Sequence, residues 1–102
     1  PQPGNDATLN ASTAGSSSLE VTWSKATDTS TTESKLEYKV FYSTSDNIGT
    51  VSNARSNGNE GISWTANIAK ATVSGLNRGT SYYFNVVVRD AARNKAAYDS
   101  VS

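Results

Sequence analysis

The amino-acid sequence predicts an all-β domain in which two antiparallel sheets pack face to face. Short segments of alternating apolar and polar residues recur along the chain, and this pattern is typical of strands with one buried face. Polar, turn-rich stretches separate the segments, and no long helical repeat competes with them. The chain has 102 residues, which is the length of one domain. Short strands at this spacing favour a single β-sandwich.

The N-terminal part of the chain carries the first two predicted strands. Residues 1–5 hold both prolines and one glycine, so we expect a short leader there and a domain over residues 6–102. Residues 8–14 form a weak strand, and residues 18–23 form a stronger one with a regular alternation. The inward face of the second strand carries Leu19, Val21 and Trp23.

The third predicted strand spans residues 36–43 and follows a loop, residues 24–34, that is rich in Ser and Thr and lacks an apolar anchor. The alternation along this strand places one set of side chains toward the core: Leu36, Tyr38, Val40 and Tyr42. Glu37, Lys39 and Phe41 point outward. Phe41 is therefore an aromatic side chain on the outer face of the sandwich.

The middle segment, residues 44–69, is too long for a hairpin loop and should carry structure of its own. The stretch TVSNARSNG predicts a short helix with Thr50 as its N-cap and Gly58 ending it in the left-handed conformation. Three apolar residues alternate loosely after this helix: Ile62, Trp64 and Ile68. They predict a short strand or an extended run along the edge of the sandwich.

The last three predicted strands span residues 71–76, 81–90 and 95–101. In the long strand 81–90, the even positions share the inward face: Tyr82, Phe84, Val86 and Val88. The odd positions share the outward face: Tyr83, Asn85, Val87 and Arg89. Tyr82 follows a Gly-containing corner directly. A buried tyrosine hydroxyl needs a partner, and we expect the backbone of that corner to provide it.

The corner and the strand after it resemble the E–F corner of a fibronectin type III domain. The residues that carry this resemblance are Leu76, Gly79, Thr80, Tyr82, Phe84 and Val86. The same family is matched by Trp23 and by the run Tyr38-x-Val40-x-Tyr42. The resemblance covers about residues 7–101. It implies an immunoglobulin-like sandwich of seven strands, with an insert between strands C and E that carries the short helix.

Two stretches, LEYKVFYSTSDNI and VRDAARNKAAY, further resemble bacterial, surface-associated members of this family. Two positions depart from the family pattern. Arg78 stands where the corner usually has proline, and Arg93 stands where the F–G turn often has glycine. The Arg-Gly-Asp adhesion motif is absent, because Arg78-Gly79-Thr80 is the structural corner. Integrin binding is therefore not implied.

The composition excludes several classes of function. The chain has no Cys and no His, so it offers no thiolate nucleophile, no disulfide and no imidazole base or metal ligand. Nine basic and nine acidic residues give a formal net charge of zero, without the clustered Lys and Arg that nucleic-acid binding needs. No apolar run approaches the roughly 20 residues of a membrane span. We expect no cofactor, no nucleic-acid partner and no membrane insertion.

Acidic residues are the remaining candidates for chemistry. Glu20 and Glu37 lie on outward strand faces with lysines nearby, so a carboxylate pair for glycoside hydrolysis is not expected. Four loop carboxylates have the oxygen ligands that calcium takes: Asp28, Glu33, Asp46 and Asp90. No Asp-x-Asp-x-Asp-Gly loop is present, and single aspartates in loops usually cap turns. We therefore expect neither a catalytic site nor a metal site.

Two sets of apolar side chains are candidates for contacts. The inward set is expected to form the structural core rather than a ligand pocket: Trp23, Tyr38, Val40, Leu76, Tyr82, Phe84 and Val86. The outward set would be a ligand or partner surface if it were exposed: Phe41, Tyr83 and Val87, together with Trp64. The alternative, which we favour, is that the middle segment covers this face through Ile62, Trp64 or Ile68.

These observations predict a non-catalytic, monomeric module that serves as a spacer and presentation domain in a larger bacterial secreted or cell-surface protein. The expected partners are neighbouring domains of the same chain, and the expected location is extracellular or on the cell surface. The alternative is a binding module that recognises a polysaccharide or a host protein through the outer aromatics or the B–C and F–G loops. Joint exposure of Phe41, Tyr83 and Trp64 would favour the binding module.

Overall fold

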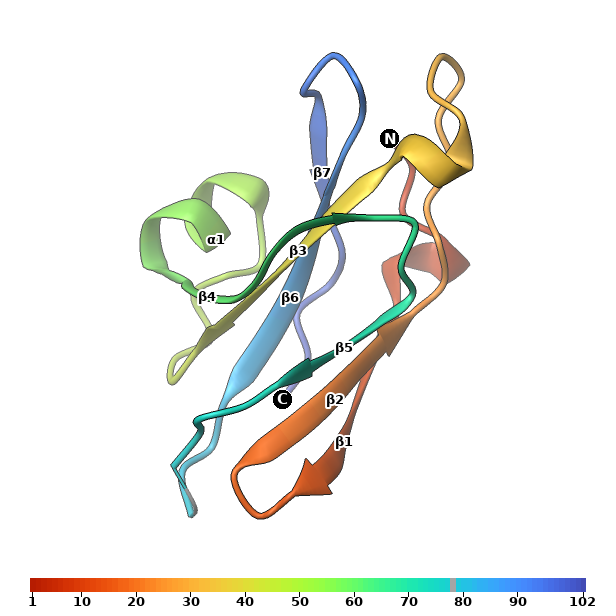
Figure 1. Ribbon diagram of the computed structural model, residues 1–102. Coiled ribbons are helices and arrows are strands. Elements are labelled where there is room, and N and C mark those ends of the chain that lie inside the picture. The colour runs from red at the N-terminus through yellow and green to blue at the C-terminus, as the bar shows by residue number, and fades with distance from the viewer. Residues whose placement is uncertain (78) are drawn as a thin grey trace.

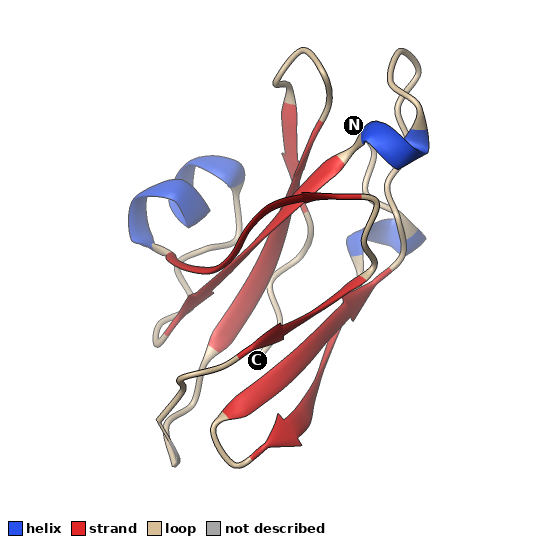
Figure 2. Cartoon of the chain, viewed as in Figure 1, coloured by secondary structure: helices blue, strands red, loops and turns tan. Residues whose placement is uncertain are grey.

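The computed structural model describes residues 1–77 and 79–102, and within them it confirms an all-β, two-sheet antiparallel sandwich of seven strands with one short α-helix (Figure 1). Arg78, the position without the family's usual proline, lies outside the described residues. The strands are β1 (Leu9–Gly15), β2 (Ser18–Trp23), β3 (Glu37–Ser43), β4 (Asn59–Ala66), β5 (Lys70–Val73), β6 (Tyr83–Arg89) and β7 (Lys95–Ala97). The helical elements are α1 (Val51–Asn57) and two 3-10 turns, η1 (Asn5–Ala7) and η2 (Glu33–Lys35) (Figure 2).

The strands form two sheets with different neighbours. β1, β2 and β5 form one sheet in that order, and β4, β3, β6 and β7 form the other. β3 and β6 pair without a register shift, from Glu37 opposite Arg89 to Ser43 opposite Tyr83. Because side chains alternate along a strand, the even residues of β6 face the other sheet and the odd ones face away from it. The helix α1 packs on this second, outer face (Figure 1).

The main core lies between the two sheets. Trp23 of β2 and Tyr38 of β3 meet there, with ring centroids 5.7 Å apart. The fully buried members of this core are Val21, Ala26, Leu36, Tyr38, Val40, Val73, Phe84, Val86, Val88 and Tyr98. Burial of one large apolar side chain contributes about 1.5–3 kcal/mol. The inner faces of the strands therefore provide most of the driving force for this fold.

The middle segment contributes a complete strand to the four-stranded sheet. β4 has eight residues and pairs antiparallel with β3, so it is an edge strand rather than a run laid across the edge. The register shifts on both sides of Val40. Such bulges insert an extra residue, which explains why the alternation in the sequence is loose. Ile62 packs against the main core, whereas Trp64 lies on the outer face.

The helix α1 begins as predicted and ends differently. The Thr50 hydroxyl accepts a hydrogen bond from the Asn53 amide at 3.1 Å, which confirms the N-cap. The left-handed ending at Gly58 is wrong, because this residue has φ −79° and ψ 149°. A Cβ at Gly58 would lie 2.6 Å from the Ala54 carbonyl oxygen and 3.0 Å from the Phe41 Cβ. Glycine is needed here because the helix end approaches β3 closely.

The N-terminal segment lies against the loop between β2 and β3, the B–C loop. Gln2 and Thr27 exchange two backbone hydrogen bonds, at 2.7 and 2.9 Å. The Gly4 amide donates to the Tyr98 hydroxyl, and this hydroxyl donates to the Ser24 carbonyl. These bonds fasten the segment that the sequence assigns as a leader to the side of the sandwich.

The B–C loop has an apolar anchor that the sequence interpretation missed. Ala26 is fully buried, and its amide donates a hydrogen bond to the Tyr38 hydroxyl at 2.8 Å. The expectation that this loop lacks an anchor is therefore wrong. A small residue such as alanine gives little signal in a stretch rich in Ser and Thr.

Candidate functional site

The outer face of the four-stranded sheet was the first candidate for a ligand surface. Phe41 and Val87 are 5% and 0% exposed. They form a second apolar cluster with two buried residues from the middle segment: Ile48 and Ala54. Tyr83 and Trp64 are half-buried at the margin of this cluster. Within the described part of the chain, no large hydrophobic side chain is exposed, so this face offers no open apolar surface.

The residues that cover this face differ in part from those expected: Trp64 does pack against the cluster, but it is not the main cover. Coverage comes from Ile48 and from α1, which contributes Ala54 and the partly buried Val51. Ile62 and Ile68 instead pack against the core between the sheets. Ile48 lies in the irregular segment before the helix, where alternation gives no information on side-chain direction.

Asn85 holds this cover in place. It is fully buried at the centre of β6, and its side-chain amide donates to the Ile48 carbonyl at 2.8 Å. Its side-chain oxygen accepts a hydrogen bond from the Val86 amide, also at 2.8 Å. Both ends of the buried amide are thus satisfied, as buried polar groups require. The sequence places Asn85 on the outward face, and a lone Asn within an apolar run was the available signal for such a role.

Charged side chains of the neighbouring strands surround Trp64 on the same face; we call Glu37, Lys39, Glu60 and Arg89 the charged ladder. The Arg89 guanidinium is 4.2 Å from the centre of the Trp64 ring, which is the geometry of a cation–π contact. Arg89 Nε also donates to Glu37 Oε1 at 2.8 Å. On the neighbouring strand, Lys39 pairs with Glu60 at 3.1 Å and lies 5.9 Å from the Trp64 ring centre. These contacts leave the indole only partly accessible to a ligand.

The two outward glutamates do not form a catalytic pair. Glu20 belongs to β2 in the three-stranded sheet, whereas Glu37 belongs to β3 in the other sheet. Both residues lie outside the core, so they stand on opposite sides of the sandwich. Glycoside hydrolysis requires two carboxyl groups within about 5–10 Å of each other. This arrangement does not provide them.

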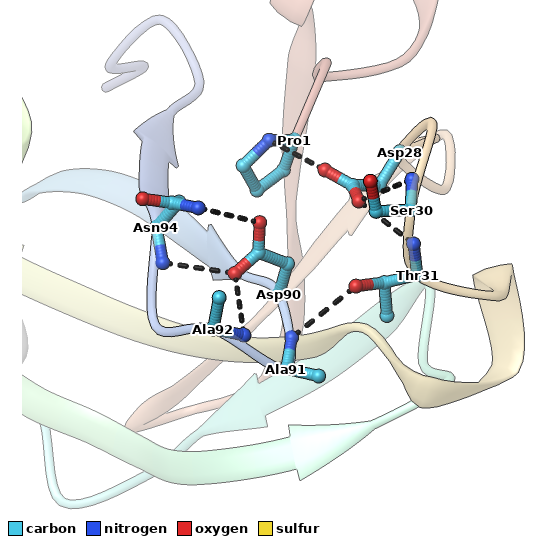
Figure 3. Close-up of polar contacts among 8 residues, drawn as sticks. All are labelled: Pro1, Asp28, Ser30, Thr31, Asp90, Ala91, Ala92 and Asn94. Carbon is cyan, nitrogen blue, oxygen red and sulfur yellow. Dashed lines mark hydrogen bonds and ion pairs between the residues drawn. The ribbon is translucent and has the colours of Figure 1, made fainter.

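The B–C loop and the F–G loop (residues 90–94) meet at one end of the sandwich (Figure 3). Asp28 accepts hydrogen bonds from the amides of Ser30 and Thr31 at 3.0 and 2.8 Å. Its carboxyl group also pairs with the N-terminal ammonium of Pro1 at 3.0 Å. This ammonium and the two amides hold the pKa of the Asp28 carboxyl below its ordinary value. Asp28 therefore caps the turn of its own loop.

Asp90 has the same role in the F–G loop. Its Oδ1 accepts hydrogen bonds from the amides of Ala92 and Asn94, both at 2.9 Å, and its Oδ2 accepts one from the Asn94 side chain at 3.1 Å (Figure 3). The Ala91 amide donates to the Thr31 hydroxyl at 3.3 Å and links the two loops.

Loop carboxylates were the candidates for calcium. The shallow depression between the two loops is lined by Asp28 and Asp90, but turn amides occupy oxygens of both. Glu33 lies in η2, and Asp46 accepts a hydrogen bond from Ser100. Among the side chains that the structure describes, no group of three or more acidic residues could hold a metal ion.

Most of the inward residues that were expected to form the core do so. Trp23, Tyr38, Val40, Leu76, Phe84 and Val86 are buried between the sheets. Tyr82 is half-buried, and its hydroxyl accepts a hydrogen bond from the Asn77 amide at 2.9 Å. This bond is the expected contact with the preceding corner. The corner is thus fastened to the beginning of β6.

Comparison with known proteins agrees with this geometry. The fibronectin type III domain family matches residues 1–100 of the chain. No curated protein matches it. None of the helices in the described residues is long and apolar enough to cross a membrane. The match covers nearly the whole chain and includes the sandwich, the corner bond of Tyr82 and both loops. The chain belongs to the fibronectin type III domain family.

Proposed function

We propose that this chain is a non-catalytic module that serves as a spacer and presentation domain in a larger bacterial secreted or cell-surface protein. Fibronectin type III domains are generally binding or structural modules within larger chains, and they often occur in extracellular proteins. The bacterial context rests on the resemblance of residues 36–48 and 88–98 to that branch of the family. The expected partners are neighbouring domains, and no cofactor is expected.

The observation that carries this proposal is the position of the two chain ends. Gln2 pairs with Thr27 at the end of the sandwich where the B–C and F–G loops meet. Val101 exchanges backbone hydrogen bonds with Phe84, near the beginning of β6. From Phe84 to Asp90, β6 covers about 20 Å. Neighbours joined to the two ends would therefore attach toward opposite halves of the domain, the N-terminus in the upper half and the C-terminus in the lower half of the view (Figure 1).

The closed outer face gives further support. A binding module of the kind considered above would use Phe41, Tyr83 and Trp64 together, but α1 and the charged ladder cover much of this surface. The fixed N-terminal segment also suits a spacer, because a segment bonded to the domain transmits orientation better than a flexible linker. Both terminal segments are hydrogen-bonded to the domain, and its outer face is covered by its own side chains. Such a domain can set the distance between its neighbours.

Small-angle X-ray scattering on a tandem of two copies tests this proposal. Ser102 of the first copy is joined directly to Pro1 of the second. We expect an extended pair whose centre-to-centre separation clearly exceeds the 22–24 Å width of the domain, which is the separation that a side-by-side pair would give. A matched tandem with an inserted flexible Gly/Ser linker should show a broader distribution of distances.

Two results would contradict the spacer role. The first is a folded-back pair with a much shorter separation in the direct tandem. The second is micromolar binding of a polysaccharide or a host protein by the single domain, which would favour a binding module acting through the B–C and F–G loops.

A further inference from the structure

The C-terminal end of α1 places an asparagine directly before a glycine. Asn57 is the last residue of the helix, and Gly58 follows it. No other asparagine of the chain is followed by glycine, and the Asn57 side chain is exposed. Because glycine has no Cβ to stand in the way, its backbone nitrogen has open access to the side-chain amide of the residue before it. This pair is therefore the most reactive Asn-containing step in the chain.

Packing of the helix against the sheet requires the glycine at position 58. A Cβ there would lie 2.6 Å from the Ala54 carbonyl oxygen and 3.0 Å from the Phe41 Cβ, so a larger residue would displace the helix or β3. The close approach of α1 to β3 thus keeps an unshielded backbone nitrogen next to the Asn57 side chain. The reactive pair is a consequence of the way in which α1 covers the outer face.

Hydrogen bonds hold both reacting groups in the folded domain. The Gly58 amide donates to the Ala54 carbonyl at 2.9 Å, as the C-cap of the helix. The Asn57 side-chain amide donates to the Asn47 carbonyl, also at 2.9 Å. The first bond keeps the nitrogen in the helical ladder, and the second keeps the side chain turned toward the segment before α1. Attack on the side chain therefore requires this end of α1 to open.

Opening of α1 is a local event. The helix has seven residues, and a helix this short is not stable by itself. It is held by the Thr50 cap and by the packing of Val51 and Ala54 on the sheet. Asn57 is exposed, so its own burial does not oppose the opening. Short, exposed ends of this kind open at a small cost in free energy while the rest of the domain stays folded.

We propose that Asn57 is a site of spontaneous covalent modification, gated by the opening of α1, at which the asparagine converts to aspartate and isoaspartate. In the open helix, the Gly58 amide gives its proton to hydroxide, and its nitrogen bonds to the side-chain carbonyl carbon of Asn57. The bond from that carbon to the side-chain nitrogen breaks, and the nitrogen takes up a proton and leaves as ammonia. Water then opens the resulting cyclic imide at either carbonyl. One opening gives aspartate, and the other gives isoaspartate, in which the main chain runs through the former side chain.

Both products weaken the end of the helix. Each replaces the side-chain amide by a carboxylate, which has no proton to donate to the Asn47 carbonyl. The new negative charge lies at the C-terminus of α1, where the helix dipole disfavours it. Isoaspartate also adds one carbon to the main chain between α1 and β4. We expect the helix end to loosen, and with it the cover over Phe41 and Val87. This inference does not depend on the spacer role.

Peptide mapping by mass spectrometry tests the modification. The folded chain is incubated at mildly alkaline pH beside a sample unfolded in urea, and isoaspartate is labelled with isoaspartyl methyltransferase. We expect Asn57 to react before any other asparagine of the folded chain, and to react faster in the unfolded one. Asn57→Gln is the control. It keeps a side-chain amide but should stay unmodified over the same time, because its longer side chain closes a larger and less favourable ring.

The helix cap tests the gating by α1. Thr50→Ala removes the hydroxyl that accepts from the Asn53 amide, so α1 should open more often and Asn57 should react about threefold faster or more. Thr50→Ser keeps a capping hydroxyl and should react at the rate of the unsubstituted chain. In urea, where the helix is absent, all three chains should react at the same rate.

A matched pair of charge substitutions tests the effect on the helix. Asn57→Asp gives the aspartate product directly, and hydrogen exchange at the Ala54 amide, which donates to the Thr50 carbonyl, should become about two- to fivefold faster. Asn53→Asp adds the same charge at an exposed position in the first turn of α1. Because the dipole favours a negative charge there, it should slow this exchange.

Three results would overturn the proposal. The first is an Asn57 that reacts after another asparagine of the folded chain, or that stays intact for about a hundredfold longer than the unfolded chain needs to react. The second is an equal rate of modification in folded Thr50→Ala and in the unsubstituted chain. The third is an equal change of Ala54 exchange in Asn57→Asp and Asn53→Asp.

Discussion

The side-chain amide of Asn85 donates a hydrogen bond to the backbone carbonyl of Ile48 across 2.8 Å, and both residues are fully buried. This bond connects the centre of β6 to the irregular segment that precedes α1. Ile48 and the helix can then cover Phe41 and Val87. One buried amide thus helps to hold the outer face of the sheet closed.

The first prediction concerns this amide. Asn85→Ala should lower the free energy of unfolding by about 1–3 kcal/mol, because the buried Ile48 carbonyl loses its partner. Urea unfolding would measure the change. The control is Asn59→Ala, since the Asn59 side chain is exposed and lies 3.4 Å from the Tyr42 carbonyl oxygen. It should change stability by less than about 0.5 kcal/mol. Equal effects of the two substitutions would contradict the role of Asn85.

The second prediction concerns the tyrosine at the corner before β6. Tyr82→Phe should lower the free energy of unfolding by about 0.5–1.5 kcal/mol, the usual net value of a hydrogen bond. The cost stays in this range because the Asn77 amide is at the surface, where water can replace the hydroxyl. Tyr83→Phe is the matched control, because the Tyr83 hydroxyl has no hydrogen-bond partner among the described residues. If the two variants unfold at the same urea concentration, the corner bond does not contribute.

The third prediction concerns the F–G turn, where Arg93 stands in place of the family's glycine. Arg93 has φ 71°, in the left-handed region that favours glycine. Arg93→Gly should raise the free energy of unfolding by about 0.5–1 kcal/mol, because relief of backbone strain outweighs the added freedom of the unfolded chain. Ala92→Gly, one residue earlier and without a positive φ, should lower it by about 0.4–1 kcal/mol. Destabilisation by both substitutions would show that Arg93 is not strained.

The fourth prediction concerns the N-terminal segment. A Cβ at Gly4 would lie 2.5 Å from the Lys25 carbonyl oxygen and 2.9 Å from that of Ser24. Gly4→Ala should therefore destabilise the domain by about 1–3 kcal/mol, the usual cost of overpacking, or release the segment from the B–C loop. Faster hydrogen exchange at the Gln2 amide, which donates to Thr27, would reveal the release. Gly49→Ala is the control, because a Cβ there meets nothing within 4 Å. Unchanged stability and unchanged exchange in Gly4→Ala would refute this account.

The fifth prediction concerns alkaline pH. Burial raises the pKa of the Tyr98 hydroxyl well above its ordinary value of 10, and that of Tyr38 in the same direction. The unfolded chain therefore releases these protons at lower pH than the folded chain does. Stability from these groups is fully present below about pH 10 and falls as the pH rises above it. Urea unfolding at a series of pH values should show a shallower alkaline loss for Tyr98→Phe than for the half-buried control Tyr83→Phe. Parallel curves for the two variants would argue against titration of Tyr98.

Several features of this domain follow from the sequence because they depend only on neighbouring residues. The alternation over residues 18–23 gives β2 with its bounds, since a strand with one buried face has a period of two. Thr50 caps α1 through a bond to a residue three positions away. The hydroxyl of Tyr82 reaches the corner five positions before it. In each case the partner lies within a few residues, so the local pattern contains the information.

The features that only the tertiary structure decided depend on segments that are far apart in the chain. Nothing local to Phe41 or Val87 indicates that Ile48 and Ala54 will bury them, because the path of an irregular segment leaves no periodic signal. Glycine is required at position 58 because Phe41 of β3 lies against it, and its backbone is extended rather than left-handed. The sequence by itself therefore determined the two sheets and their inward faces. The closure of the outer face and the fixed N-terminal segment arise from long-range packing and hydrogen bonds, which form only when the whole chain has folded.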